Sequence, residues 1–429
     1  MSYPQTNTVF PYFHLLVLLP LIYLLSGCAS TSPAFPELEG TYLDRAQVQE
    51  KNGIRVTAAV PSAKETEQLF GKKLYKRGVQ PVWLEIENLR GQHVSFLPVG
   101  LDPAYFTPIE AANLNSKASD NNSKSSAVNE QFFLAGLNLN VPPGEKRNGF
   151  VFSELDEGTK SFNVDVIGDQ SLVTFTFFIP VPGLRVDHYN VDWKNLYPDQ
   201  EPEPLSAESL IETIESTVCC VKDAKGENYG DPLNLVIIGD IEDVYYSFIR
   251  AGWDETETIH RGSLLKTLKS FVSGSEYRYS PVSALYVMNR PQDVAFQKAR
   301  TNIHERNHLR LWLTNTSYEG KSVWIGQISR DIGVRFTRKT ITTHKIDANV
   351  DETREYLLEN LAYSQALKKF AYVGGVGEAP IDQPRGNLTG DPYFTDGYRI
   401  VLWVTSMPTD ISDIEFEYWR VPPGNRSTP

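Results

Sequence analysis

The residues best able to do chemistry, His308, Asp331 and His344, occur close together between residues 300 and 354. A histidine oriented by a carboxylate can act as a general base, and nearby arginines can neutralise an anion that develops during a reaction. These three are therefore the candidate catalytic residues of a hydrolase of the phosphoester type. The candidate ligand-binding residues around them are Arg306, Arg310, Arg330, Asp347 and Arg354.

The same segment differs in charge from the rest of the chain. Residues 300–354 contain ten Lys and Arg against six Asp and Glu, a net charge of +4, whereas the whole chain carries −12 and its remainder therefore −16. Local positive potential attracts a small anion such as phosphate, or an anionic lipid head group. Two strands with solvated outer faces would have the same composition. The acidic chain as a whole argues against a general nucleic-acid binder.

Each candidate also has a structural interpretation. His308 and Arg310 suit a hydrogen-bonded core histidine and an ion-paired arginine, and Asp331 before Ile332-Gly333 suits a turn. The sequence contains no Gly-x-Ser-x-Gly or Cys-x-x-Cys motif, and its His-Glu-x-x-His sequence, His304 to His308, begins a predicted strand and is not on a helix, where the two histidines of such a motif bind one metal. It therefore predicts no metal site and no particular cofactor, and it leaves a binding protein and an enzyme both open.

The segment that carries these residues is predicted to be a β-hairpin. Apolar and polar residues alternate from Arg306 to Trp312, which places Arg306, His308 and Arg310 on one face of a strand. Turn-forming residues then lead into a second strand at 321–328, and a helix capped by Asn349 follows. Together with further strands and a helix on either side, this pattern predicts an α+β domain with a mixed sheet over residues 231–421.

The earlier part of the chain is predicted to be all-β. Short runs of alternating apolar residues, separated by turns, indicate a β-sandwich of immunoglobulin-like architecture over residues 41–185. Within it, 116–129 is polar and is predicted to be a flexible insertion. Residues 186–230 are rich in proline and acidic residues and are predicted to be a linker with one short helix at 206–218. Their adjacent Cys219 and Cys220 are predicted to be free thiols, because disulfides normally hold two Cα atoms well apart.

The N-terminus predicts export. The apolar run Leu15–Leu25 is shorter than the roughly 20 residues of a spanning helix, and it ends in Leu25-Ser26-Gly27-Cys28. This pattern resembles a bacterial lipoprotein signal peptide, although no Lys or Arg precedes Arg45. Residues 1–27 are thus the predicted signal peptide, Cys28 the predicted site of lipidation with palmitate, and 28–40 a tether. A plain secretory peptide or an uncleaved anchor is the alternative.

Location and partners follow from that resemblance. Ala29 after the cysteine implies, as in similar lipoproteins, an outer-membrane lipoprotein that faces the periplasm. The predicted partners are the membrane, through the lipid at Cys28, and an envelope or secretion-associated protein. A phosphate-like compound or a lipid head group is the predicted ligand.

Several short motifs of the second domain occur in the same order as in a known domain family. They are Asp231-Pro232-Leu233-Asn234-Leu235-Val236, Ala251-Gly252-Trp253, Pro281-Val282-Ser283, His308-Leu309-Arg310-Leu311-Trp312, Arg330-Asp331-Ile332-Gly333 and Thr343-His344-Lys345-Ile346-Asp347. In this respect residues 231–405 resemble the LssY C-terminal domain. The resemblance implies no particular reaction. In that family the domain also occurs beside phosphatase-like membrane modules, whereas this chain has a predicted signal peptide and a predicted sandwich in their place.

Overall fold

The computed structural model describes residues 41–114, 122–168, 170–184, 191–193, 195–198, 200–256, 282–299, 306–335 and 343–422. The predicted signal peptide, Cys28 and His304 lie outside these residues. Residues Glu39–Pro429 form one compact unit. The described chain is mostly β, with a mixed sheet in its C-terminal part, as the sequence predicts.

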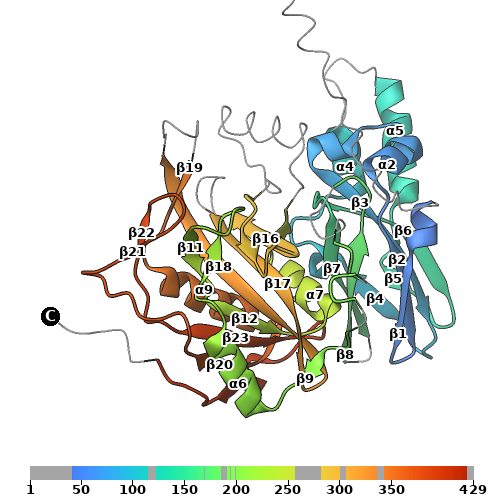
Figure 1. Ribbon diagram of the computed structural model, residues 1–429. Helices are drawn as coiled ribbons and strands as arrows, with labels where there is room; N and C mark the ends of the chain where they lie inside the picture. The colour runs from blue at the N-terminus through green and yellow to red at the C-terminus, as the bar shows by residue number, and fades with distance from the viewer. Residues whose placement is uncertain are drawn as a thin grey trace, which may run out of the picture. The chain divides into compact units, whose positions relative to one another are not determined.

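Two four-stranded antiparallel sheets occupy the first part of the chain (Figure 1). In sheet order they are β1 (Gln47–Lys51), β2 (Ile54–Ala59), β3 (Val79–Asn88) and β6 (Lys146–Glu154), and β5 (Asn140–Val141), β4 (Val94–Leu97), β7 (Thr159–Gly168) and β8 (Ser171–Pro180). Alternate apolar residues of both sheets share one core, for example Val56, Leu84, Val164 and Phe175. The predicted period of two thus buries one face of each sheet.

Helices add a second small core to this region, which the sequence did not predict. The helices of this region are α2 (Ala63–Phe70), α3 (Pro98–Leu101), α4 (Pro108–Leu114) and α5 (Asn122–Ala135), and 3-10 turns span Tyr42–Arg45 and Leu74–Arg77. The second core takes residues from α2, α4 and α5, whereas Leu101 of α3 belongs to the first. Phe132 of α5 is fully buried and stacks on Phe152. The prediction of a flexible insertion at 116–129 was therefore wrong where α5 lies. Its polar first turns hid the apolar spacing of Val128, Phe132 and Ala135.

One large mixed sheet dominates the C-terminal part. Its order is β13 (Asp254–Glu255), β16 (Val294–Ala299), β17 (Arg306–Tyr318), β18 (Lys321–Arg335), β12 (Leu235–Ile238), β23 (Arg399–Val404), β20 (Leu367–Val373) and β24 (Glu415–Glu417). β19 (Thr343–Ile346) pairs with β18, and β9 (Glu203–Pro204) pairs with β17. Most pairs are antiparallel, but β12 and β23 run parallel. The predicted hairpin is β17–β18, and Glu319 and Gly320 at its tip have positive φ.

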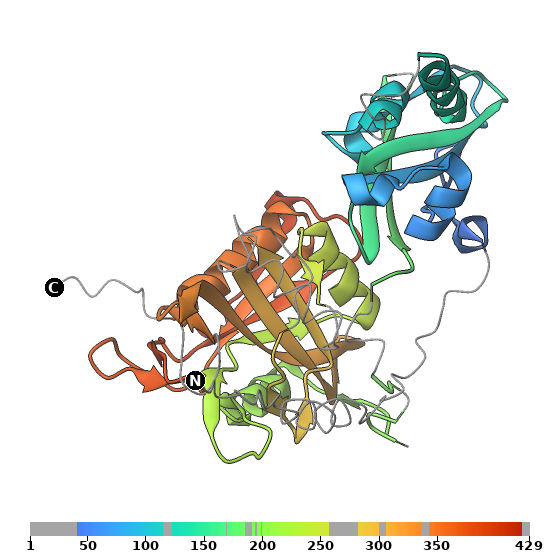
Figure 2. The same cartoon turned by 90° about the horizontal axis from the view of Figure 1, so that it is seen from above.

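Helices cover both faces of the large sheet (Figure 2). α7 (Ile241–Arg250) and α9 (Val350–Tyr363) pack on one face, where Phe248 and Leu357 meet Leu309 and Leu311. α6 (Ala207–Ser216) packs on the other, where Leu210 and Ile214 join a core that contains Trp312. The predicted cap of α9 is present, because the Asn349 side chain accepts a hydrogen bond from the Glu352 amide.

The segment predicted as a linker contains regular structure and anchors. α6 lies within it, at the predicted helix, and is capped by Ser206. Ahead of α6, Trp193 packs edge-on against Trp324, and the Tyr197 hydroxyl donates a 2.8 Å hydrogen bond to the Leu313 carbonyl. The domain boundaries at residues 185 and 231 remain predictions.

The remaining described strands form two small sheets. One has the order β11 (Tyr229–Pro232), β10 (Cys220–Lys222), β14 (Tyr286–Val287) and β15 (Arg290–Pro291); the other pairs β21 (Arg385–Gly386) with β22 (Pro392–Tyr393). A 3-10 turn spans Ile411–Asp413. Where β10 begins, Cys219 and Cys220 form a disulfide, so the prediction of free thiols was wrong. The usual Cα separation of disulfides does not apply to a ring closed across a single peptide bond.

Candidate functional site

Alternation along the β17–β18 hairpin separates an apolar face from a polar one. Leu309, Leu311 and Ile328 enter the core beneath α7 and α9. Arg306, His308 and Arg310 point to the opposite face, as predicted, and are each no more than 7% exposed. Antiparallel register sets His308 opposite Ser329 on β18 and Gln297 on β16, and sets Arg310 opposite Gln327. This group, with Asp331, is termed the strand-face cluster below.

Hydrogen bonds, and one ion-pair contact between His308 and Asp331, link the strand-face cluster into one chain. Arg310 donates to Gln327 at 2.9 Å, and the Gln327 amide donates to the Ser329 hydroxyl at 2.9 Å. Ser329 Oγ lies 3.0 Å from His308 Nε2, and His308 Nδ1 lies 3.6 Å from Asp331 Oδ1. Arg306 closes the chain by donating to Asp331 Oδ2 at 3.2 Å and to Gln297.

Asp331 is the acid of the strand-face cluster. Burial raises its pKa to about 6, against the opposing effects of Arg306 and Arg310. A carboxyl with a pKa near 6 exchanges its proton close to neutral pH, which is the range that general acid–base chemistry needs.

Two further aspartates extend the cluster. Burial also raises the pKa of Asp231 on β11, while Asn387, which donates to its Oδ1 atom at 3.0 Å, and the charge of Arg310 oppose the rise. Asp391 is 2% exposed, accepts a hydrogen bond from Thr389, and raises the pKa of both Asp231 and Asp331 by its charge. Two buried guanidinium groups thus lie near three carboxyl groups, of which those of Asp331 and Asp391 are buried and that of Asp231 belongs to a half-buried residue.

The comparison with known families concerns the part of the chain that contains this cluster. A family model described as the LssY C-terminus matches residues 203–398. Residues 203–398 are therefore similar to the LssY C-terminal domain, and this region is termed the LssY domain below. No curated protein matches the chain. The match confirms the predicted resemblance, but it begins ahead of residue 231 and so includes α6 and both cysteines.

Other predicted site residues of the LssY domain lie away from the strand-face cluster. Arg330 is on the opposite face of β18, where it donates to Asn307 and covers the Tyr356 ring at 5.4 Å. Asp347 accepts a hydrogen bond from the Asn349 amide just before α9. His344 pairs with Val334 through the backbone of β19, and its side chain lies outside the described residues.

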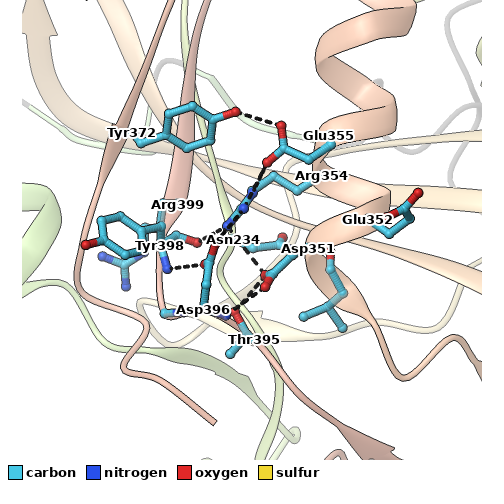
Figure 3. Close-up of polar contacts among 12 residues, drawn as sticks. Asn234, Asp351, Glu352, Arg354, Glu355, Tyr372, Thr395, Asp396, Tyr398 and Arg399 are labelled. Carbon is cyan, nitrogen blue, oxygen red and sulfur yellow. Dashed lines mark hydrogen bonds and ion pairs between the residues drawn. The ribbon is translucent and has the colours of Figure 1, made fainter. Parts of the chain in front are cut away.

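Arg354 belongs to a separate buried ion cluster (Figure 3). Its guanidinium forms a two-pronged pair with Asp396, at 3.0 and 2.9 Å, and contacts Asp351 at 3.4 Å and Glu355 at 2.8 Å. Burial lowers the pKa of Arg354, but these carboxylates outweigh it and leave the pKa raised. Because Arg354 also bonds the Tyr398 carbonyl, it ties α9 to the segment ahead of β23. The ion pairs of Arg354 therefore have a structural role, since they join two elements of the fold.

Arg399 is a second buried arginine, and backbone carbonyls surround its guanidinium. It is fully buried, and burial lowers its pKa to about 10. Its guanidinium donates to the carbonyls of residues 214, 217, 218, 233 and 375. The turn that carries the Cys219–Cys220 disulfide is therefore held to β23 through one side chain.

Residue pattern alone did not single out Gln297, Ser329, Gln327, Asp231 or Asp391. Gln327 and Ser329 precede Asp331 at spacings of two on a predicted strand, so alternation could have placed them on its face. Asp231 and Asp391 come from other elements, and only the tertiary fold brings them near. Among the residues that the structure describes, no group of three or more His, Cys, Asp and Glu side chains could hold a metal ion.

Proposed function

We propose that this protein is an outer-membrane lipoprotein facing the periplasm, and that its LssY domain binds a small anionic ligand or an anionic envelope component at the strand-face cluster. The observation that carries the proposal is the placement of Arg306, His308 and Arg310 on one buried strand face. Guanidinium groups match the oxygens of phosphate in geometry and charge, and the low dielectric of a buried site strengthens that attraction.

The neighbouring carboxyl groups make anion binding dependent on protons. Asp331 contacts both Arg306 and His308, and its pKa near 6 allows it to become neutral under mildly acidic conditions. A neutral Asp331 leaves the charge of Arg306 to an incoming anion. We therefore infer that the anion replaces the negative charge of Asp331 and that binding takes up a proton.

Thermal unfolding with and without inorganic phosphate at pH 6 tests this proposal. Phosphate at 100 times its dissociation constant stabilises the folded state by about 2.7 kcal/mol, which raises the Tm of the wild-type protein. Arg310→Gln should remove this rise, whereas Lys321→Gln, at the far end of β18, should keep it. Circular dichroism confirms that each variant is folded. A wild-type Tm that does not respond to phosphate contradicts the proposal.

The proposed anchor rests on the apolar run Leu15–Leu25 and the motif that ends at Cys28. Among the described residues, no helix is long and apolar enough to cross a membrane. The immunoglobulin-like architecture proposed for the first two sheets suits a spacer between the membrane and the LssY domain. Mass spectrometry of the envelope fraction should find an acylated Cys28. A Cys28→Ser protein that matures and stays membrane-bound contradicts the anchor.

The second candidate function is hydrolysis of a phosphoester in the envelope, with His308, Asp331 and His344 as the proposed catalytic residues. The contact between His308 Nδ1 and Asp331 favours it, because a carboxylate that orients an imidazole makes it an effective base. Release of p-nitrophenol from p-nitrophenyl phosphate measures this activity. It should fall about 10²-fold or more in His308→Gln. Equal rates for wild type and His308→Gln contradict it.

A further inference from the structure

The directions of the hydrogen bonds from Arg310 to Gln327 and from Gln327 to Ser329 follow from which groups can donate and which can accept. Arginine only donates, so the Gln327 atom that faces Arg310 is the oxygen and the atom that faces Ser329 is the NH₂ nitrogen. Ser329 Oγ accepts that bond and keeps its own proton available for His308 Nε2, 3.0 Å away. In the tautomer that carries its proton on Nδ1, beside Asp331 Oδ1, His308 accepts a hydrogen bond from Ser329. The chain therefore orders a hydroxyl, an imidazole base and a carboxylate.

The sheet face that carries the strand-face cluster is apolar further along the same two strands. Trp312 and Ile325 are the next cross-strand pair after Arg310 and Gln327, and both are buried in an apolar core. Burial of polar side chains carries a desolvation penalty that hydrogen bonds only partly offset. The polar pairs Arg310–Gln327 and His308–Ser329 interrupt that core at the place where Asp231 and Asp331 also gather. A chemical role explains this interruption better than stability does.

We propose that Ser329 is the nucleophile of the LssY domain, with His308 as its general base and Asp331 as the residue that positions His308. The proposal rests on the hydrolase function proposed above and adds the residue that forms the covalent bond. The substrate class is a phosphoester, whose oxygens Arg306 and Arg310 are placed to bind. The arrangement has the same roles as serine–histidine–aspartate hydrolases, here supplied by two neighbouring strands.

The reaction balances without any further reagent except water. Ser329 Oγ attacks phosphorus while its proton passes to His308 Nε2, and the bond from phosphorus to the leaving alcohol breaks. His308 returns that proton to the alcohol oxygen. Water then attacks the phosphoserine, giving a proton to His308 as the bond from Oγ to phosphorus breaks. The proton moves to Ser329 Oγ, and the products are the alcohol and phosphate.

Covalent labelling tests the proposal without knowledge of the natural substrate. Diisopropyl fluorophosphate phosphorylates an activated serine and releases fluoride, and peptide mass spectrometry locates the adduct. We expect one adduct on Ser329 in the full-length protein. Ser329→Ala should lack it, His308→Gln should form it about 10²-fold more slowly or less, and Ser322→Ala, on the same strand, should label as the wild type does. A folded wild-type protein without an adduct on Ser329 overturns the proposal.

A second measurement separates this proposal from the anion site. Ser329→Ala keeps Arg306, His308 and Arg310, so phosphate should still raise its Tm by the wild-type amount. Loss of labelling with retained phosphate binding assigns Ser329 to the covalent step. If phosphate stabilises the wild-type protein but Ser329 is not labelled, the nucleophile is wrong and the anion site stands. If phosphate has no effect while Ser329 is labelled, the anion site is wrong and the nucleophile stands.

Discussion

Asp331 Oδ1 lies 3.6 Å from His308 Nδ1 on the neighbouring strand, and both side chains are buried. Burial raises the Asp331 pKa from 3.8 to about 6, so the folded state holds this proton more tightly than the unfolded state does. The stabilising effect is complete below pH 3.8 and is lost as pH rises through 6. Relative to Asp331→Asn, the free energy of unfolding of the wild-type protein should therefore fall by about 3 kcal/mol between pH 3.5 and 7.

Urea unfolding at several pH values measures this difference. Asp410→Asn is the control, because hydrogen bonds from Ser412 lower the pKa of Asp410 and the sign of its effect is the opposite. Parallel pH curves for the wild-type and Asp331→Asn proteins would show that Asp331 titrates in the folded state as it does in the unfolded chain.

Anion binding should depend on the same proton. If only the form with neutral Asp331 binds, lowering the pH from 7.5 to 5.5 should raise the affinity roughly 25-fold, because the competent fraction rises with protonation. Sulfate is the suitable probe, since its own charge does not change in this range. Calorimetric titration should find this dependence in the wild-type protein and a weaker one in Asp331→Asn. An affinity for sulfate that falls on acidification contradicts the proton-coupled site.

Removal of Arg354 should destabilise the fold strongly. Arg354 is 2% exposed and lies among Asp351, Glu355 and Asp396, so Arg354→Met leaves buried carboxylates without their cation. Loss of one partner from a buried ion pair costs about 3–5 kcal/mol. Arg420→Met is the matched control, because the Arg420–Glu215 pair is solvent-exposed, and exposed pairs contribute about 0–1 kcal/mol. Equal losses in urea unfolding would contradict a fastening role for Arg354.

Gly375 should tolerate alanine poorly because of Arg399. A Cβ atom there would lie 2.4 Å from Arg399 Nη1 and 2.8 Å from the Glu215 carbonyl, and φ is +106°. Gly390 also has a positive φ, +79°, but open space around its Cα. Gly390→Ala should cost about 1–2 kcal/mol from backbone strain alone. Gly375→Ala should cost at least about 3 kcal/mol, because it also displaces the buried guanidinium. Similar melting temperatures for the two variants would show that Arg399 adjusts freely.

Local patterns predicted the hairpin and much of the cluster. Alternation needs only neighbouring residues, so it placed Arg306, His308 and Arg310 on one face before any fold was known. The Asn349 cap was predictable for the same reason, since both partners lie within four residues. Ser329 required the register between β17 and β18, because a shift of one residue would turn its side chain to the opposite face.

Long-range partners were beyond the reach of these patterns. Arg354 was predicted to bind a ligand, and nothing in the sequence pointed to its pair with Asp396, which lies 42 residues away. Arg399 is buried because it donates to carbonyls on three separate segments, and no spacing in the sequence encodes these contacts. The wrong prediction at α5 has a local cause. The apolar stripe of the helix is present in the sequence, but the polar composition of the segment favoured a flexible insertion.

The oxidation state of Cys219 and Cys220 indicates whether the protein has been in an oxidising compartment. A ring closed over one peptide bond removes little freedom from the unfolded chain, so its presence changes global stability less than a long cross-link would. Its formation instead needs an oxidising compartment. After alkylation under denaturing conditions without reductant, exported molecules should keep both sulfurs blocked, whereas molecules retained in a reducing cytoplasm should gain two alkyl groups. The mass of one tryptic peptide thus becomes a record of export.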